Sequence, residues 1–424
     1  MLKKRENMKI RVNSEIGKLE GVILHSPGPE IENMTPKNAE RALYSDILNL
    51  SVAKKEYRQF NDVLDKFTTT FQVKDLLTDI LSNDKVKNDL ISKIYLNECQ
   101  MSKNGRYMNE LLDQPEEEIA RQLIEGRIMK KDTLTNFLDE DRYSLKPLHN
   151  FFFTRDAAVS IYDTVHINRM ANKVRERESQ IMEAIFENHP NFKAKTLNPL
   201  NSESFDDKIS LEGGDVLVFS DNIILIGNSA RTTTQGIDYI LQEMKKLKGK
   251  HHIIVQELPY TPESFIHLDM VFTMLDTDKC MVYKPLIMDS NRFLTIHLSI
   301  DNGKVTINEE INILTALKAL GHDLEPIFCG GNSDSYIQER EQWHSGANFF
   351  ALAPGQVIGY GRNVYTLEEM NKNGFEIIRA KDLLSGKTDA EKYDKFVITV
   401  EGSELSRGGG GCRCMTMPVR RKPV

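Results

Sequence analysis

A pattern that repeats after residue 148 is the feature that most constrains the fold. Each copy has a polar cluster, an apolar run, a turn and a second apolar run, and the copies occupy residues 151–170, 210–233, 267–287 and 347–365. The clusters begin roughly 55 to 80 residues apart, within or above the range of repeated units such as propeller blades. Residues 18–28 add a related strand that ends in a Pro-Gly turn. We therefore predict about five α/β modules in a ring, with the polar end of each module at one centre.

Residues 73–147 differ in composition and predict a helical insertion. They are poor in glycine, and Pro115 precedes three glutamates, which favour a first helical turn. Ile119 and Leu123 would share one helix face, and Gly126 would end the helix. We expect this insertion to have its own small core. It would interrupt a catalytic α/β domain that is formed by residues 1–72 and 148–424.

The composition argues against several classes of protein. The chain has 424 residues, 40% hydrophobic and 28% charged, which is enough to bury a large core. Its apolar runs are shorter than a membrane span and no signal peptide is evident, so we expect a cytoplasmic protein without membrane contact. The formal charge of −7 and the lack of a dense basic stripe argue against nucleic-acid binding. The five cysteines are mostly scattered, which argues against a disulfide framework.

The tail GGGGCRCMTMP, at residues 408–418, presents Cys412 and Cys414 on a glycine run. Glycine lets the backbone approach a ligand closely, and a cysteine placed there is suited to act as a nucleophile. Three polar clusters upstream could assist it: FTRD at 153–156, LEGGD at 211–215 and HLDMVFT at 267–273. Together they predict a cysteine hydrolase that acts on a cationic substrate.

The side chains of these clusters allow more than one role. Asp156 and Asp269 could cap turns or form salt bridges, but two carboxylates together can hold a planar guanidinium in bidentate geometry. Glu212 precedes two glycines and fits a structural turn as well as a functional site. His267 would share a strand face with Asp269 if that segment is extended, and it could transfer protons near neutral pH.

A metal site is a further interpretation of His267 and Asp269, with Cys412 and Cys414 as additional ligands. The two cysteines lack the paired spacing that zinc sites usually have. We therefore expect no metal.

As a set, the motifs resemble the arginine deiminase family of the guanidine-modifying superfamily. The resemblance covers nearly the whole chain and rests on EIGKLEGVILHSPG, FTRD, EGGDV, HLDMVFT, REQWHSGAN, PGQVIGYGRNVYT and CRCMTMP. It implies a five-bladed pseudo-symmetric α/β propeller with an inserted helical bundle. It also implies hydrolysis of free L-arginine to L-citrulline and ammonia through a covalent cysteine thiouronium, without metal or organic cofactor. A homodimer or larger homo-oligomer is implied as well.

Matched by position, the resemblance implies a role for each site residue. Cys414, in the Cys-Met-Thr-Met-Pro ending, corresponds to the nucleophile, and His267 corresponds to the proton shuttle. Glu212 corresponds to the carboxylate at the reacting carbon, with Asp156 and Asp269 as the guanidinium clamps. The positions implied to contact the carboxylate, the amino end and the aliphatic stem of the substrate are Asn150, Arg175, Arg231 and Phe153.

Gly409 departs from the pattern of some family members, which carry an arginine five residues before the nucleophile. The nearest upstream arginine here is Arg407. Because the difference concerns carboxylate recognition, a hydrolase of agmatine or methylated arginines and a catalytically silent arginine-binding protein stay as alternatives. Arg175 and Arg231 favour a substrate that bears a carboxylate, and the intact set of catalytic residues favours an enzyme.

The three carboxylates also predict how the thiol of Cys414 behaves. Negative charges nearby should raise its pKa, whereas a bound cationic substrate should lower it. We therefore expect the nucleophile to be activated mainly when substrate is present.

Overall fold

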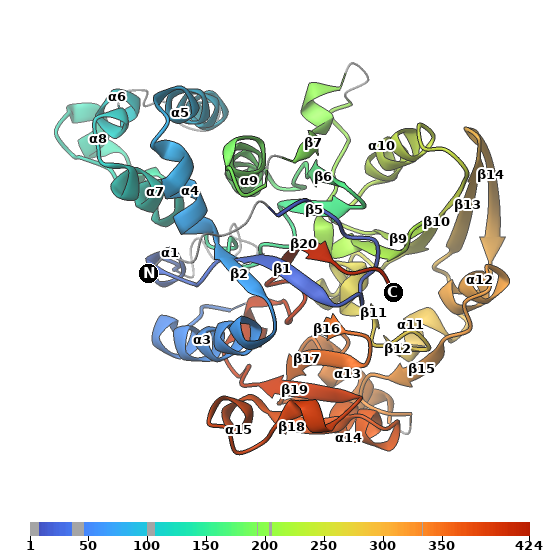
Figure 1. Cartoon of the computed structure of the whole chain (residues 1–424). Helices are drawn as coiled ribbons and strands as arrows, with labels where there is room; N and C mark the ends of the chain where they lie inside the picture. The colour runs from blue at the N-terminus through green and yellow to red at the C-terminus, as the bar shows by residue number, and fades with distance from the viewer. Residues whose placement is uncertain (1–7, 36–45, 100–106, 193, 203–205, 333) are drawn as a thin grey trace.

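The computed structural model describes residues 8–35, 46–99, 107–192, 194–202, 206–332 and 334–424. Within these ranges the strands form six sheets, and helices lie between and beside them, so the chain has a mixed α/β fold (Figure 1). The strands of these ranges do not close into a barrel. The α/β class is confirmed, while the arrangement of the modules as a five-bladed propeller stays a prediction.

Five of the sheets have three or more strands each. In spatial order their strands are β2-β1-β20 (Thr69–Gln72, Leu19–Leu24, Met417–Arg421), β5-β6-β7 (Ala158–Ile161, Thr164–Ile167, Lys195–Leu197), β14-β13-β10-β9-β8 (Lys304–Glu310, Thr295–Asp301, Lys250–Glu257, Ile223–Asn228, Val216–Ser220), β11-β12-β15 (Phe272–Met274, Lys279–Val282, Glu325–Phe328) and β16-β17-β19-β18 (Phe350–Ala353, Gln356–Tyr360, Phe396–Val400, Glu376–Arg379). The sixth is the hairpin of β3 (Arg127–Ile128) and β4 (Tyr143–Leu145).

The same connection recurs in these sheets. An antiparallel hairpin is followed by a helix and by a strand that pairs parallel to the second hairpin strand, as in β5-β6-β7 and β8-β9-β10. The sheet β11-β12-β15 has the same pairing, but α11, β13, β14 and α12 lie between β12 and β15. The repeats expected at 151–170, 210–233, 267–287 and 347–365 each contain one such hairpin, so their strand-turn-strand reading is confirmed. In the first sheet, β20 from the C-terminal end pairs with β1 from the N-terminal end. This pairing places the cysteine tail beside the start of the chain.

The α-helices of the described residues connect or cover these sheets. They are α1 (Pro29–Glu32), α3 (Leu50–Phe67), α4 (Val73–Leu81), α5 (Asp84–Cys99), α6 (Tyr107–Leu112), α7 (Glu116–Glu125), α8 (Leu134–Leu138), α9 (Glu176–Asn188), α10 (Thr234–Met244), α11 (Lys284–Ile287), α12 (Ile313–Ala319), α13 (Ser335–Trp343), α14 (Val364–Lys372) and α15 (Ala380–Leu384). None of them is long and apolar enough to cross a membrane.

The helical character expected for residues 73–147 is confirmed by α4 to α8, at the upper left of Figure 1. Pro115 is the N-cap of α7 and three glutamates fill its first turn. Gly126 ends the helix with φ of 85°, a backbone conformation that costs glycine little. The sequence therefore predicted both ends of this helix correctly.

The separate core expected for these helices is wrong. Buried side chains of α4 and α7, such as Leu76 and Leu123, belong to one apolar cluster with Phe186 of α9 and Val165 of β6. Helix α4 lies against both α7 and α9. The reason is that the apolar faces of these helices also meet the helix that covers the β5-β6-β7 sheet. A core formed in this way couples the helical region to the α/β part of the chain.

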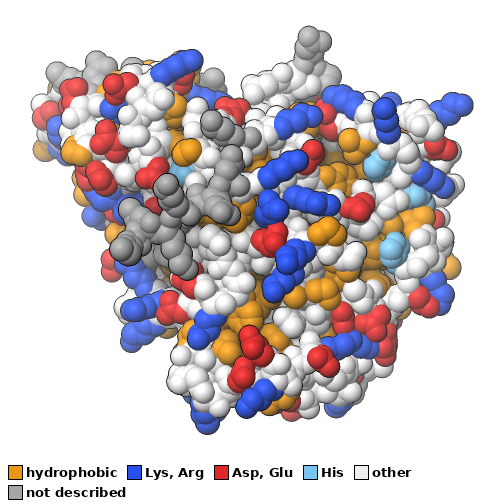
Figure 2. All heavy atoms as spheres, viewed as in Figure 1, with side chains coloured by type: hydrophobic (Ala, Val, Ile, Leu, Met, Phe, Trp, Pro, Cys, Tyr) orange, Lys and Arg blue, Asp and Glu red, His pale blue; other side chains and the backbone are white. Residues whose placement is uncertain are grey.

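The outer surface carries mixed charge. Figure 2 shows Lys and Arg side chains interspersed with Asp and Glu over most of the visible face. Apolar side chains are also exposed at α8, where Leu134, Phe137 and Leu138 are each more than two-thirds accessible.

Replacement of Leu123 by alanine tests the shared core. Leu123 is fully buried, so Leu123→Ala should lower the free energy of unfolding by about 2 to 5 kcal/mol. The matched control Leu134→Ala, at a 75% exposed leucine of the same region, should change it by less than about 0.5 kcal/mol. Urea denaturation followed by circular dichroism measures both. Because the core is shared, Leu123→Ala should shift a single transition, and a separate early transition of the helices would contradict this account.

Candidate active site

A small buried cavity of about 30 Å³ collects residues from four distant parts of the sequence. Its lining consists of Asn150, Phe153, Asp156, Arg175, Glu212, Arg231, Ile266, His267, Gly408, Gly409, Gly410 and Cys414. Most of these residues lie in the segments that enter the hairpins β5-β6, β8-β9 and β11-β12 and the strand β20. The expectation that the polar clusters converge at one centre is therefore confirmed.

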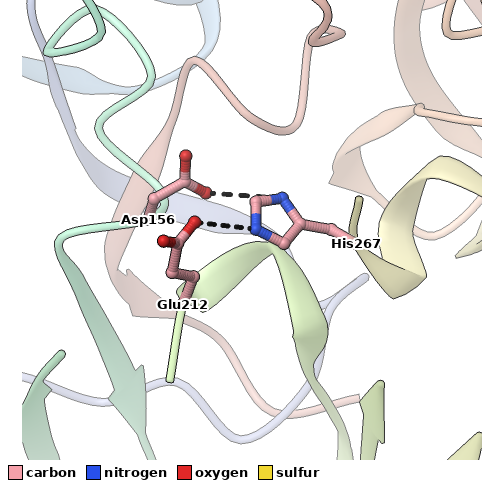
Figure 3. Close-up of side chains that lie close together, drawn as sticks. All are labelled: Asp156, Glu212 and His267. Atoms are coloured by element: carbon pink, nitrogen blue, oxygen red, sulfur yellow. Dashed lines mark hydrogen bonds and ion pairs between the residues drawn. The ribbon is translucent and has the colours of Figure 1, made fainter. Parts of the chain in front are cut away.

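His267 stands between two carboxylates at this centre (Figure 3). Its Nε2 lies 3.0 Å from Glu212 Oε2, and its Nδ1 lies 3.8 Å from Asp156 Oδ1. Burial opposes a charge on the imidazole, but the charge of Asp156 and the hydrogen bond to Glu212 outweigh it and raise the pKa of His267 to about 9. At neutral pH this histidine is therefore an imidazolium, which can donate a proton.

The glycines after Glu212 allow this close approach. A Cβ atom at Gly214 would overlap the imidazole ring of His267, so a larger residue would displace the histidine. Asp215, next in the chain, accepts hydrogen bonds from Leu268 N at 2.9 Å and from Ser229 Oγ at 2.6 Å. The LEGGD segment thus supplies one catalytic candidate and also fixes the loop that carries His267.

Glu212 is fully buried and stays ionised. Burial alone would raise its pKa, but the hydrogen bond to His267 and the charges of Arg231 and Arg175 lower it to about 2. Its Oε1 also accepts a hydrogen bond from Ala171 N at 3.2 Å. A carboxylate held in this way attracts cations into the cavity.

The guanidinium group of Arg175 occupies part of the acidic cavity. Its Nη1 donates to Asp156 Oδ2 at 2.9 Å and lies 3.7 Å from Glu212 Oε2, while Nη2 donates to Glu178 Oε2 at 2.8 Å. All four side chains are buried. The cavity therefore has the charge and hydrogen-bond acceptors that suit a guanidinium ion.

Cys414 lies with its thiol beside Asp269 and Asn348. Its Sγ is 3.7 Å and 3.9 Å from the carboxylate oxygens of Asp269, and Asn348 Nδ2 lies 3.3 Å from the sulfur. Burial, followed by the charges of Asp269 and Asp156, raises the pKa of Cys414 well above its usual value. The thiol is therefore protonated at neutral pH in the empty site, as the sequence predicted.

Asp269 is beside the thiol but does not line the cavity. Its Oδ2 accepts a hydrogen bond from Arg413 Nη1 at 2.8 Å. Arg413 also makes a bidentate pair with Glu15, through Nε at 2.9 Å and Nη2 at 3.0 Å, and donates to Val216 O. This fully buried arginine anchors the nucleophile loop to the N-terminal segment and to the strand β8.

Sequence reasoning missed Arg413, Glu15 and Asn348 as parts of the site. Asn348 holds the loop from the other side, because its Oδ1 accepts a hydrogen bond from Arg413 N at 2.9 Å while its Nδ2 donates to Asp269 O. The residues lay within the motifs EIGKLEG, QWHSGAN and CRCMTMP. The one local signal was Arg413, which lies between Cys412 and Cys414. A cation at that apolar position needs a buried acidic partner, so the sequence could have indicated that such a partner exists.

Three side chains of the cavity offer atoms that could bind a metal ion. Asp156, Glu212 and His267 each offer a ligand atom within 4.8 Å of the others, and among the described residues this is the one group of three with that property. Cys412 and Cys414 are not in it. A metal ion would have to displace the proton of His267 and the guanidinium of Arg175, which already faces Asp156 and Glu212. This donor set fits an organic cation better than a metal ion.

The chain matches the family model described as arginine deiminase over residues 40–421. It is 34% identical to the arginine deiminase of Oenococcus oeni over 434 aligned positions, with 99% of each chain covered. Arginine deiminases of Bacillus cereus and Limosilactobacillus fermentum are 34% and 32% identical, with 98% of this chain and 99% of each relative covered.

Solved structures with a similar fold belong to more distant proteins. SxtG, an amidinotransferase from Microseira wollei, superposes with a TM-score of 0.53 at 13% identity and 98% coverage of both chains. The N-terminal domain of ArgZ, an arginine dihydrolase from Cyanobacteria, has a TM-score of 0.53 at 11% identity, with 95% of this chain and 98% of that chain covered. At these identities the likeness concerns the fold alone.

The pKa of His267 is a direct test of the charge arrangement. It should titrate near 9 rather than 6.5, because Asp156 and Glu212 stabilise the imidazolium. Glu212→Gln should lower this pKa, whereas Glu178→Gln, which removes a buried carboxylate bonded to Arg175, should change it little. Histidine NMR signals, assigned with His267→Gln, measure the titration.

The sign of the stability effect follows from the same pKa. The charged interaction contributes fully below pH 6.5 and is lost as the pH rises through about 9. Wild type should therefore be more stable than Glu212→Gln at neutral pH, with a smaller difference above pH 9. A midpoint for His267 at or below 6.5 in wild type would show that the assigned charges are wrong.

Proposed function

The chain belongs to the arginine deiminase family, and from this premise we propose that its buried cavity hydrolyses free L-arginine to L-citrulline and ammonia. One observation carries the proposal: the cavity that Cys414 lines already holds a guanidinium group, that of Arg175, against Asp156 and Glu212. A nucleophile, an imidazolium and guanidinium acceptors thus share one buried space. Binding alone needs neither the nucleophile nor the proton donor, so the arrangement favours an enzyme.

Substrate binding begins with an exchange of guanidinium groups. Asp156 cannot hold both Arg175 and the substrate in bidentate geometry, so Arg175 leaves Asp156 and turns toward the substrate carboxylate. Arg231 and Asn150 line the same cavity and contact the α-carboxylate and α-amino end, while Phe153 packs on the aliphatic stem. Asp269, already 3.7 Å from the thiol, is the second clamp beside the reacting carbon.

The bound cation activates the nucleophile. Burial and the charges of Asp269 and Asp156 keep Cys414 protonated in the empty site, and a guanidinium ion at the same carboxylates compensates their charge. The thiol therefore releases its proton to solvent, and the thiolate attacks the guanidinium carbon. A C–S bond forms, and the C–N π electrons of the guanidinium move onto nitrogen. The product of this step is a tetrahedral adduct that Glu212, Asp156 and Asp269 surround.

His267 moves the protons of both later steps. As an imidazolium it protonates one nitrogen of the adduct, the C–N bond breaks, and ammonia departs from a covalent thiouronium. The neutral imidazole then takes a proton from water, which attacks the same carbon. The C–S bond breaks as the remaining hydroxyl proton of the adduct passes to the departing sulfur, which releases L-citrulline and restores the Cys414 thiol and the imidazolium. Every step uses side chains of this chain.

The finer architecture is part of the same proposal. We propose that the five larger sheets are the blades of a pseudo-symmetric propeller, which the recurrent hairpin-helix-strand connection and the β1–β20 pairing support. Residues 1–72 and 148–424 would form this catalytic domain, with 73–147 as the inserted helical domain.

The assembly and the location of the protein are also proposed. The exposed Leu134, Phe137 and Leu138 support a homodimer or larger homo-oligomer with contacts at α8. The described cysteines Cys280, Cys329, Cys412 and Cys414 are free thiols, which supports a reducing, cytoplasmic location. Free L-arginine is the one partner that the mechanism requires, without nucleic acid or membrane.

Citrulline formation from L-arginine tests the function. Cys414→Ala should lower kcat/KM by at least about 10⁴-fold, because the covalent step is lost. The control Cys412→Ala removes a buried thiol that does not line the cavity and should keep most of the activity. Equal loss in both variants would indicate damage to the loop rather than loss of the nucleophile.

Agmatine in the same assay decides between substrates. It lacks the carboxylate that Arg175 and Arg231 are proposed to bind, so wild type should turn it over poorly. If agmatine or a methylated arginine is preferred, the enzyme is a related guanidine hydrolase. If no guanidine substrate is hydrolysed, the proposed activity is wrong and a binding role takes its place.

A further inference from the structure

A second cavity adjoins the catalytic one, and apart from Arg231 its side chains have no role in the mechanism above. It measures about 400 Å³ and is lined by Asp46, Arg231, Glu263, Ser264, Ile266, Trp343, His344, Arg362, Ser403, Ser406, Arg407, Gly408 and Gly409. Arg231, Ile266, Gly408 and Gly409 line both cavities. We refer to it as the outer cavity.

Gly409 leaves the boundary between the two cavities free of a side chain. Its φ is +82°, a conformation that favours glycine, and a Cβ at this position would meet no atom within 4 Å. A ligand in the outer cavity can therefore lie close to a ligand in the catalytic cavity.

Arg362 brings a cation into the outer cavity that forms no ion pair with a described residue, although the charge of Glu56 acts on it. Its Nη1 donates to Ser406 Oγ, to Ser403 O at 3.2 Å and to Gly402 O at 3.4 Å, and its Nη2 faces His344 Nε2 at 3.3 Å. None of these acceptors is charged. Within the part of the chain that the structure describes, no carboxylate forms an ion pair with it.

The neighbouring Arg407 lines the same cavity and, unlike Arg362, forms ion pairs with carboxylates. It donates twice to Asp46 Oδ2, at 2.8 Å and 2.6 Å, and once to Glu404 Oε2 at 3.1 Å. Arg231, at the boundary of the two cavities, differs from Arg362, because its charge already acts on Glu212 in the catalytic cavity. Glu263 also lines the outer cavity and is paired with neither arginine. Arg362 is thus the cation of the outer cavity whose hydrogen-bond acceptors are all neutral.

His344 adds a hydrogen-bond donor. Because its Nε2 faces the guanidinium of Arg362, that nitrogen accepts a hydrogen bond and the ring proton lies on Nδ1. Nδ1 is buried and has no partner among the described residues. Burial and the charges of Arg362 and Arg340 lower the pKa of His344 to about 4, so the ring is neutral at pH 7. A neutral donor and a cation side by side suit an oxyanion.

We propose that the outer cavity is a binding subsite for a small oxyanion, a carboxylate or a phosphate, held by Arg362 with His344. This subsite is separate from the guanidinium acceptors Asp156 and Glu212. The anion has two sources: the carboxylate of a molecule whose guanidinium lies in the catalytic cavity, or a free ion in solution. Either source completes the charge balance of the cavity.

Trp343 allows the subsite to be tested without catalysis. It is the one tryptophan of the chain, it is 44% exposed, and it lines the outer cavity. In the titration inorganic phosphate replaces chloride, so that the ionic strength stays constant. Tryptophan fluorescence is recorded at each phosphate concentration. Wild type should show a saturable change. A change that is absent, or that grows linearly without saturation, would overturn the proposal.

Four variants locate the binding. Arg362→Gln should weaken phosphate binding about tenfold or more, because a charge-assisted hydrogen bond is lost. His344→Ala should weaken it several-fold, and Arg362→Lys should retain it within a few-fold. Arg58→Gln removes an exposed charge of α3 that lines neither cavity and is the matched control, with little change expected. If Arg362→Gln does not fold, His344→Ala and Arg362→Lys decide. Equal affinity in wild type and in both Arg362→Gln and His344→Ala would place the ion elsewhere and overturn the proposal.

Competition in the Cys414→Ala variant distinguishes the two sources of the anion. If the carboxylate of the bound substrate fills the subsite, L-arginine should weaken phosphate binding and agmatine should not. If the ligand is a free ion, phosphate should bind equally well beside either compound. Calorimetry establishes separately that L-arginine binds this variant. Because phosphate binding is measured without turnover, failure of the proposed activity would leave this result interpretable.

Discussion

Buried carboxylates surround the thiol of Cys414, and the cations that balance them organise the rest of the site. Ions removed from water are tolerated in proteins when they are paired and hydrogen-bonded. Glu212 meets this condition through His267, Asp156 through Arg175, and Asp269 through Arg413. The same pairs set the chemistry: they hold the histidine protonated, keep the thiol neutral and leave guanidinium acceptors facing the cavity.

The network also explains how one cavity is assembled from distant segments. The loops that enter the hairpins carry the polar clusters, and the strand β20 returns the tail to β1. Arg413 then bonds Glu15 at one end of the chain and Asp269 in the middle, so the nucleophile loop is fixed to two other modules. In the proposed mechanism Arg175 is the member that moves, because it is paired with Asp156, where the substrate guanidinium would bind.

Sequence reasoning predicted what depends on local pattern. The hairpins, both ends of α7 and the convergence of the clusters around His267 and Cys414 followed from periodicity, turn residues and motif chemistry. It missed what depends on distant partners. Glu15 and Arg413 are 398 positions apart, and nothing near either residue identifies the other. The core shared by Leu123 and Phe186 was missed for the same reason, since an amphipathic helix does not reveal which element it packs against.

The pH at which Cys414 loses its proton tests the central claim most directly. Thiolate absorbance is recorded against pH in wild type minus Cys414→Ala, first with the site empty and then with guanidinium ion at a concentration that does not denature the protein. We predict a pKa well above the usual thiol value in the empty site, because of burial and the charges of Asp269 and Asp156, and a lower value with the cation bound. A thiolate at neutral pH in the empty protein, unaffected by guanidinium, would contradict it.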